Sequence, residues 1–362
     1  MIGRGEHPDG DADCKESGRD GRMRASDSEH AYLAQPVPEL PSVSVVVPTR
    51  DRADGVLVCV RAACADPATT EVVAVVDGSR DDTVARLQAF ARDEGRLRIV
   101  ERAGAGAAAA RRVGAASATG DVILMLDDDV VVEAGTVTGH ARRHVGGDPN
   151  LVVVGYMPTK IPATKQANRF TSEIYARDYE THVNRWDREP GRVLQTLWGG
   201  NVSMRRDLCV RAADQAASFP AVNHNDRELG VQLLSLGGRG LFDRQLAAVH
   251  HHSRSLDAFL RDARKLGAGR HILHDRHPDV YGPFDPRSIV ADLPTPVQRA
   301  LIAAATRPRL HDAVLAAGRR TVSVAGRAGL HTVPRVSARL LRRIEVVRGA
   351  YDAQAGAFRV GD

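Results

Sequence analysis

The stretch Val122-Ile-Leu-Met-Leu-Asp-Asp-Asp-Val130 joins five apolar residues to three consecutive carboxylates. The apolar run holds no turn former, which is typical of a strand buried on both faces of a parallel sheet. Adjacent carboxylates repel one another in water, whereas divalent cations such as Mg²⁺ and Mn²⁺ favour clustered oxygen ligands. In open α/β sheets, ligands bind beyond the carboxyl ends of the strands. The stretch therefore predicts a metal-binding strand end, with a solvated acidic turn as the alternative.

Strands and helices alternate around this stretch. Before it, we expect strands at Val43–Val47, Val72–Val76 and Leu97–Val100, with helices at Gly55–Ala65, Asp82–Glu94 and Ala107–Ala118. After it, we expect helices at Thr136–His144, Ala163–Asn184 and Asp226–Leu236, and strands at Leu151–Tyr156 and Leu241–Val249. Alternating elements with short loops indicate an α/β protein with a parallel sheet and helices on both faces.

Composition divides the chain into three parts. Residues 1–40 contain almost no large apolar side chains, so we expect a disordered tail there. Residues 41–290 carry the strands and form the main domain. Residues 291–362 form a basic helical C-terminal region, with breaks expected at Gly318, Gly326 and Pro334. This region predicts a packing or oligomerising appendage, with contact to a membrane surface as the alternative.

The overall composition restricts the classes of partner and compartment. The 362 residues carry a formal net charge of +5, and their Arg and Lys residues lack the interleaved aromatics of a strand-binding groove. We therefore expect no nucleic-acid partner. The four cysteines form no Cys-x-x-Cys pair, and no apolar run reaches the roughly 18 residues of a membrane span. We expect a cytoplasmic protein without a signal peptide, peripheral on the inner face of the membrane if the C-terminal region binds lipid.

A glycine-rich segment invites a different interpretation. Gly104-Ala-Gly-Ala-Ala-Ala109 satisfies the dinucleotide-binding pattern and precedes a helix. However, it follows the third strand rather than the first, and the strand before it ends in Glu101–Arg102. We therefore interpret these glycines as easing entry into the helix, and the dehydrogenase reading is the weaker one.

The order of motifs resembles the family 2 inverting glycosyltransferases with the GT-A fold over roughly residues 43–270. The segments similar to family motifs are Val43-Ser-Val-Val-Val-Pro-Thr-Arg-Asp-Arg52, Val75-Val-Asp-Gly-Ser-Arg-Asp81, Ala110-Arg-Arg-Val-Gly114 with Ala118-Thr-Gly-Asp121, Leu126-Asp-Asp-Asp129, Gly199-Gly-Asn201, Asn225-Asp226-x-Glu-Leu-Gly230 and the histidines after Val249. Val76, Arg112 and Asn225 depart from the usual Asp, Asn and Glu.

This resemblance implies a GT-A (Rossmann-like) fold: a mixed, mostly parallel sheet flanked by helices, with a C-terminal helical appendage. The nucleotide-binding half would span residues 41–132 and the acceptor half residues 133–290. The implied reaction moves a sugar from a nucleotide-diphospho-sugar to an acceptor hydroxyl with inversion, assisted by Mn²⁺ or Mg²⁺. The acceptor would be a saccharide, a lipid-linked molecule or a small molecule. The alternatives are a non-catalytic nucleotide-sugar-binding protein and a nucleotidyltransferase.

The resemblance also implies roles for particular residues. Asp129 and Asp127 would hold the metal with His251, although alternation along a strand would place His250 and His252 on the opposite side from His251. Asp226 would be the catalytic base, with helix N-capping as its structural alternative. The donor would contact Pro48, Thr49, Asp51, Asp77, Arg111, Asp127 and Asp128. The acceptor would contact Trp198, Gly199, Gly200 and Asn201.

Overall fold

The structure, a computed structural model, describes residues 39–163, 168–220, 223–330 and 332–358. The expected disordered tail at residues 1–40 therefore lies almost entirely outside the described residues. From Leu40 onward the chain forms one compact unit. None of the described helices combines the length and the apolar character needed to cross a membrane.

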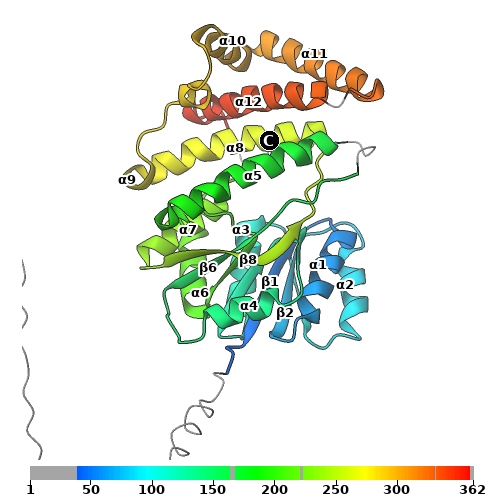
Figure 1. Ribbon diagram of the computed structural model, residues 1–362, viewed down its shortest axis with the longest axis vertical. Coiled ribbons are helices and arrows are strands. Elements are labelled where there is room, and N and C mark those ends of the chain that lie inside the picture. Colours follow the sequence, from blue (N-terminus) through cyan, green and yellow to red (C-terminus); the bar gives the residue numbers. More distant parts are fainter. Residues whose placement is uncertain (1–38, 164–167, 221–222, 331, 359–362) are drawn as a thin grey trace, which may run out of the picture. The chain divides into compact units, whose positions relative to one another are not determined.

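The described strands form a mixed sheet in the order β3-β2-β1-β4-β7-β6-β8-β5 (Figure 1). Their bounds are β1 Val43–Thr49, β2 Thr69–Asp77, β3 Leu97–Arg102, β4 Val122–Leu126, β5 Val130–Val132, β6 Leu151–Tyr156, β7 Asn201–Arg205 and β8 Arg239–His250. The pairings among β3, β2, β1 and β4 are parallel, as is β6 with β8, whereas β7 runs antiparallel to both β4 and β6. The expected mixed, mostly parallel sheet is confirmed.

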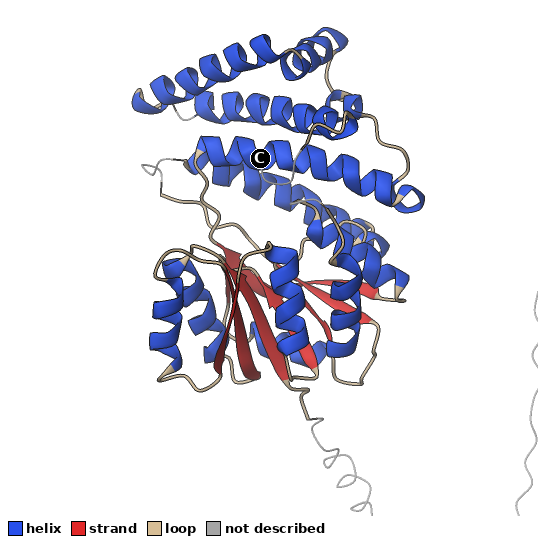
Figure 2. Cartoon of the chain, turned by 180° about the vertical axis from the view of Figure 1, so that it is seen from behind, coloured by secondary structure: helices blue, strands red, loops and turns tan. Residues whose placement is uncertain are grey.

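Helices flank this sheet (Figure 2). Their bounds are α1 Ala53–Ala65, α2 Thr83–Ala91, α3 Ala107–Ser117, α4 Thr136–Arg143, α5 Arg169–Arg188, α6 Arg206–Ala216, α7 Asn225–Ser235, α8 Leu256–Arg276, α9 Pro278–Tyr281, α10 Thr295–Thr306, α11 Pro308–Arg327 and α12 Thr332–Gln354. Every residue of β1 and β4 is buried, because helices cover both faces of these central strands. The sequence predicted the bounds of β4 and β6 without error.

The C-terminal helices stack on the main domain. Helix α12 packs along α8 and also contacts α5, α10 and α11 (Figure 1). The predicted break at Gly318 is wrong, because α11 runs through it. A Cβ at Gly318 would lie 2.6 Å from a terminal methyl carbon of Leu341, so this glycine permits close packing of α11 against α12. Pro334 lies in the first turn of α12, where no helical N–H is lost.

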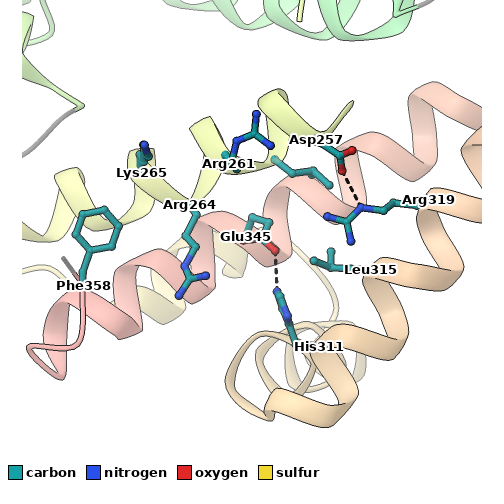
Figure 3. A pocket seen from close by; sticks show the side chains of 10 residues that line it. Asp257, Arg261, Arg264, Lys265, His311, Leu315, Arg319, Glu345 and Phe358 are labelled. Carbon is teal, nitrogen blue, oxygen red and sulfur yellow. Dashed lines mark hydrogen bonds and ion pairs between the residues drawn. The ribbon is translucent and has the colours of Figure 1, made fainter. Parts of the chain in front are cut away.

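A cavity of about 480 Å³ lies between α8, α11 and α12 (Figure 3). At its edge, Arg319 pairs with Asp257 at 2.8 Å. His311 and Glu345 also line it, and their side chains meet at 2.7 Å with about 5% exposure each. A buried pair of this kind fixes the register of α11 against α12, because neither group has water to replace its partner.

Replacing Glu345 by Ala is expected to lower the free energy of unfolding by about 2–4 kcal/mol, because it leaves the buried His311 ring nitrogen without a partner. Urea unfolding followed by circular dichroism measures the change. Asp312, which meets the other ring nitrogen of His311 at 3.2 Å but is 80% exposed, provides the control. Asp312→Ala should cost less than about 1 kcal/mol, and equal losses in the two variants would contradict the assignment.

Candidate functional site

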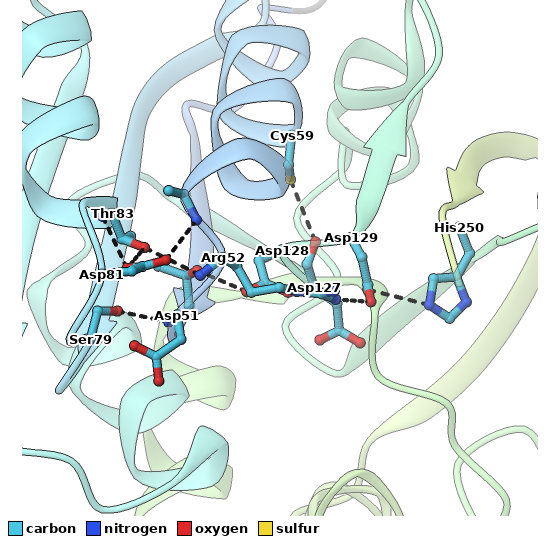
Figure 4. A network of polar contacts seen from close by, with 12 residues as sticks. Asp51, Arg52, Cys59, Ser79, Asp81, Thr83, Asp127, Asp128, Asp129 and His250 are labelled. Atoms are coloured by element: carbon cyan, nitrogen blue, oxygen red, sulfur yellow. Dashed lines mark hydrogen bonds and ion pairs between the residues drawn. The ribbon is translucent and has the colours of Figure 1, made fainter. Parts of the chain in front are cut away.

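The carboxylates of Asp127, Asp128 and Asp129 contact polar side chains at the carboxyl end of β4 (Figure 4). The Asp128 carboxylate accepts a hydrogen bond from Thr49 at 2.8 Å and pairs with Arg52 at 3.3 Å. Arg52 also pairs with Asp129, whereas Asp127 pairs with Arg111 of α3. The three side chains therefore contact different groups, and Arg52 joins two of them.

The sheet register explains why Thr49 and Arg52 reach this cluster. Strands β1 and β4 are parallel neighbours with Val46 opposite Met125, so their carboxyl ends lie side by side. The chain leaves β1 through Thr49 and enters α1 just after Arg52. The sequence analysis assigned Thr49 to the donor contacts, and the structure places it beside Asp128. It assigned no role to Arg52.

The structure brings His250 rather than His251 to the Asp129 carboxylate, with 3.3 Å between Nε2 and Oδ1 (Figure 4). Strand β5 pairs with β8 so that Val130 lies opposite His250. Side-chain alternation continues past the end of β8 at His250, and the His251 side chain is exposed. Only the backbone N–H of His251 reaches Asp129, donating to its carbonyl oxygen at 2.8 Å. The structure therefore brings the side chain of His250, and not that of the predicted ligand His251, to the Asp129 carboxylate.

Burial and neighbouring charges move the pKa values of these carboxylates in opposite directions. Burial alone would raise the pKa of Asp129, but the His250 hydrogen bond and the charges of His250 and Arg52 hold it well below its usual range. Burial raises the pKa of Asp128, and Arg52 only partly opposes this rise. Asp129 is therefore the carboxylate that stays ionised most readily.

Asp129 and His250 fit two ligand positions of a divalent cation whose coordination a bound substrate would complete. No group of three or more His, Cys, Asp or Glu side chains in the described part of the chain is arranged to hold a metal ion. A complete protein cage is not needed, because Mg²⁺ sites commonly use one or two carboxylates together with substrate phosphates and water. One carboxylate oxygen and one imidazole nitrogen 3.3 Å apart supply such a partial set.

Arg111 leaves one donor unused beside this cluster. Its guanidinium pairs with Asp127, but its buried Nε has no hydrogen-bond partner among the described residues. Burial alone would lower the pKa of Arg111, but Asp127 raises it overall. A buried donor without a partner is costly, and an oxyanion such as a phosphate would satisfy it.

The expected nucleotide residues Asp77 and Asp51 are already bonded within the protein. The buried Asp77 carboxylate accepts hydrogen bonds from the backbone of Ala105 at 3.0 Å and Gly106 at 2.7 Å, which holds the loop leading into α3. Gly104 and Gly106 have φ values of 85° and 92°, so they ease entry into α3 as interpreted. Asp51 is exposed and accepts from the backbone of Arg80 at 2.6 Å. Pro48 is buried within β1.

Gly199 and Gly200 lie between the acidic cluster and Asp226. A Cβ at Gly200 would come within 2.7 Å of the Asp127 carboxylate, and one at Gly199 within 3.2 Å of the Asp226 Cβ. Larger residues would therefore push these two carboxylate positions away from the segment. The two adjacent glycines thus lie in space between the end of β4 and the start of α7.

Asp226 lies in the first turn of α7 and is half-buried. The helix N-cap is His224 rather than Asp226, so the structural alternative of N-capping does not apply. Burial raises the pKa of Asp226, although Arg227 and Arg111 oppose the rise. A carboxyl with a raised pKa is a stronger base than an ordinary aspartate, which suits proton abstraction.

Trp198 and Asn201 differ in what they can offer a ligand. The half-buried Trp198 ring packs 5.4 Å from Tyr175 and 5.1 Å from Tyr179 between ring centres. Asn201, expected to contact the acceptor, is wholly buried. Its side-chain amide bonds the backbone of Leu246 at 2.9 Å and its oxygen lies 3.0 Å from His140, so both groups are used inside the fold. We therefore leave Asn201 out of the acceptor contacts.

Tyr175 of α5 was missed by the sequence reasoning. Its ring stacks on His252 at 4.1 Å and meets the edge of His250 at 5.0 Å. Tyr175 also contacts Trp198, so it connects the histidines with the segment that precedes the two glycines. An aromatic residue in an amphipathic helix resembles an ordinary core position, and no signal in the sequence distinguished it.

Comparisons with known proteins show what this chain is similar to. Residues 44–209 match the family model described as glycosyl transferase family 2. The mannosyltransferase PcManGT from Pyrobaculum calidifontis, solved with GDP-Man and Mn²⁺, is 19% identical with a TM-score of 0.54, covering 91% of this chain and 93% of that one. No match is found among curated proteins.

Two further solved structures are less similar. TarS 1–349 from S. aureus with UDP-GlcNAc is 16% identical with a TM-score of 0.46, covering 88% of this chain and 93% of that chain. Glucosyl-3-phosphoglycerate synthase from Mycobacterium tuberculosis with Mn²⁺ and UDP is 19% identical with a TM-score of 0.44, covering 68% and 81%. The mannosyltransferase shows the shared fold, and residues 44–209 are similar to the glycosyl transferase family 2 model.

Proposed function

We propose that this protein is a divalent-metal-dependent glycosyltransferase that moves a sugar from a nucleotide-diphospho-sugar to an acceptor hydroxyl with inversion. The observation that carries the proposal is the close approach of Gly199 to Asp226 and of Gly200 to Asp127. This closeness supports the proposal, because it puts the Asp226 carboxyl group two adjacent glycines away from the carboxylates at the end of β4. A single displacement needs such an arrangement, with the base on one side of the sugar and the leaving group on the other.

In the proposed reaction, Asp226 takes the proton from the acceptor hydroxyl as its oxygen bonds to the anomeric carbon. The bond from that carbon to the diphosphate oxygen breaks, and its electron pair leaves with the nucleoside diphosphate. Arg111, with its unpartnered buried Nε, would donate to the departing diphosphate. Trp198 would line the sugar or acceptor side, and Thr49 would hold Asp128 in place at the donor side.

The proposed metal ligands are Asp129 and His250, with Asp127 helping directly or through water. Mn²⁺ or Mg²⁺ bound there would supply Lewis-acid stabilisation of the negative charge that gathers on the diphosphate. The mannosyltransferase of similar fold was solved with Mn²⁺ and a nucleotide sugar, which is consistent with this proposal.

A thermal-shift panel of UDP, GDP, TDP and CDP, each with Mn²⁺, Mg²⁺ or EDTA, tests the proposal. One nucleotide at about 100 times its Kd should add about 2.7 kcal/mol of stability, and EDTA should remove most of that gain. A shift that EDTA leaves unchanged would remove the metal from the proposal. No shift with any nucleotide would contradict donor binding altogether.

A further inference from the structure

The side chains of two arginines near Asp226 make no ion pair among the described residues. Arg227 of α7 and Arg270 of α8 are both half-buried, and neither guanidinium makes a hydrogen bond or an ion pair with any residue that the structure describes, although the backbone N–H of Arg227 donates to Asp226 at 2.9 Å. Their neighbours behave differently: Arg342 pairs with Asp178 at 2.6 Å, and Arg276 pairs with Glu228 at 3.3 Å. Arg227 and Arg270 therefore differ from these two paired neighbours.

The packing of α8 against the start of α7 brings the two arginines into one region. A Cβ at Gly269 would lie 2.8 Å from the carbonyl oxygen of Asn223 and 3.2 Å from the His224 ring. Only glycine allows this close approach, and Arg270 follows it directly. Arg227 lies in the first turn of α7, next to Asp226. The charges of both arginines act on the buried His224, which confirms that they share one neighbourhood.

The charges that surround Arg270 are all unfavourable. Burial and the like charges of Arg227 and Arg342 together lower the pKa of Arg270 to about 10. No carboxylate opposes these effects. Half-buried cations that repel one another reduce the stability of the folded chain, so their placement points to a ligand of opposite charge.

We propose that Arg227 and Arg270 bind an anionic group, a phosphate or a carboxylate, that the acceptor carries. The inference rests on the proposed function, because Asp226 marks where the acceptor hydroxyl would lie. Guanidinium groups recognise both oxyanions with paired hydrogen bonds. The acceptor anion would lie on the Asp226 side of the two glycines, whereas the donor diphosphate would lie toward Arg111 and Asp129.

The test measures the binding of inorganic phosphate and of acetate by isothermal titration calorimetry, with UDP or GDP present to fill the donor side. We expect phosphate, acetate or both to bind the wild-type protein. Arg227→Gln and Arg270→Gln should each weaken that binding about tenfold or more. Arg261→Gln is the matched control, because Arg261 lies on the same helix α8, is exposed and also lacks a partner among the described residues. It should bind the anion like the wild type.

A stability measurement distinguishes ligand binding from a structural role of Arg270. Without anion, Arg270→Gln should have a Tm equal to or above that of the wild type, because it removes a charge that only like charges surround. With phosphate or acetate at matched ionic strength, the wild type should gain Tm and the variant should not. A variant that is less stable without anion would overturn the inference.

The possible failures are separable. The inference would be overturned if the wild type binds no anion, or if neither substitution weakens anion binding. Nucleotide binding would in either case still support the glycosyltransferase. Failure of every nucleotide to bind would contradict the proposed function instead. If only phosphate binds, the acceptor is identified as phosphorylated. If Arg270→Gln weakens the binding of acetate as much as the binding of phosphate, the acceptor group is identified as a carboxylate.

Discussion

Replacing Asp226 by Asn is expected to lower turnover by about 10²–10⁴-fold while donor nucleotide binding changes by less than about twofold. The amide keeps the size of the side chain and its contact with Gly199, but it cannot accept the proton of the acceptor hydroxyl. Turnover is measured as release of nucleoside diphosphate, and binding by titration of the same nucleotide. An equal loss of binding and turnover would instead make Asp226 a structural residue.

The pH profile provides an independent check on Asp226. As a base it acts only when ionised, so activity should fall as the pH falls through its pKa. Burial raises that pKa above the ordinary value of about 3.9, so the acid limb of kcat/KM should lie at a higher pH than for an ordinary aspartate. The residual activity of Asp226→Asn should lack this limb.

The stability of the same variant separates catalysis from folding. Because burial raises the pKa of Asp226, the folded state favours the protonated carboxyl, and stability is lost as the pH rises from about 3.9 through the folded pKa. Asp226→Asn removes this cost, so at pH 7 it should unfold at the same temperature as the wild type or higher. A functional residue that costs stability is expected at an active site.

The sequence was sufficient where the relevant signals lie close together in the chain. The apolar run before Asp127 predicted β4 and its acidic end, because strand and carboxylates are contiguous. Asp226 was located by its place in an order of motifs. The burial of Asn201 against His140 could not be predicted, because the two residues lie 61 positions apart and only the folded sheet brings them together. Arg227 and Arg270 likewise lie in one region because α8 packs against Asn223 and His224 just before α7, which no local pattern indicates.

The choice among the three histidines shows the same limit and leads to the second large prediction. Alternation along the strand separates His251 from its two neighbours, but it does not say which side faces Asp129. That depends on the pairing of β5 with β8, where Val130 lies opposite His250. The ring of His250 also makes a T-shaped contact with Tyr175, with 5.0 Å between ring centres.

His250→Gln is therefore expected to raise the Mn²⁺ concentration needed for half-maximal activity by about 100-fold or more, because it would remove one of the two proposed protein ligands of the cation. His251→Gln is the matched control, since the His251 side chain is exposed and only its backbone contacts Asp129. It should require the same Mn²⁺ concentration as the wild type. Reversed results would assign the ligand role to His251. If neither variant changes the Mn²⁺ requirement, Asp129 would be the main protein ligand of the cation. Because the two substitutions are chemically identical and adjacent, any difference between them must come from the side of β8 on which each side chain lies.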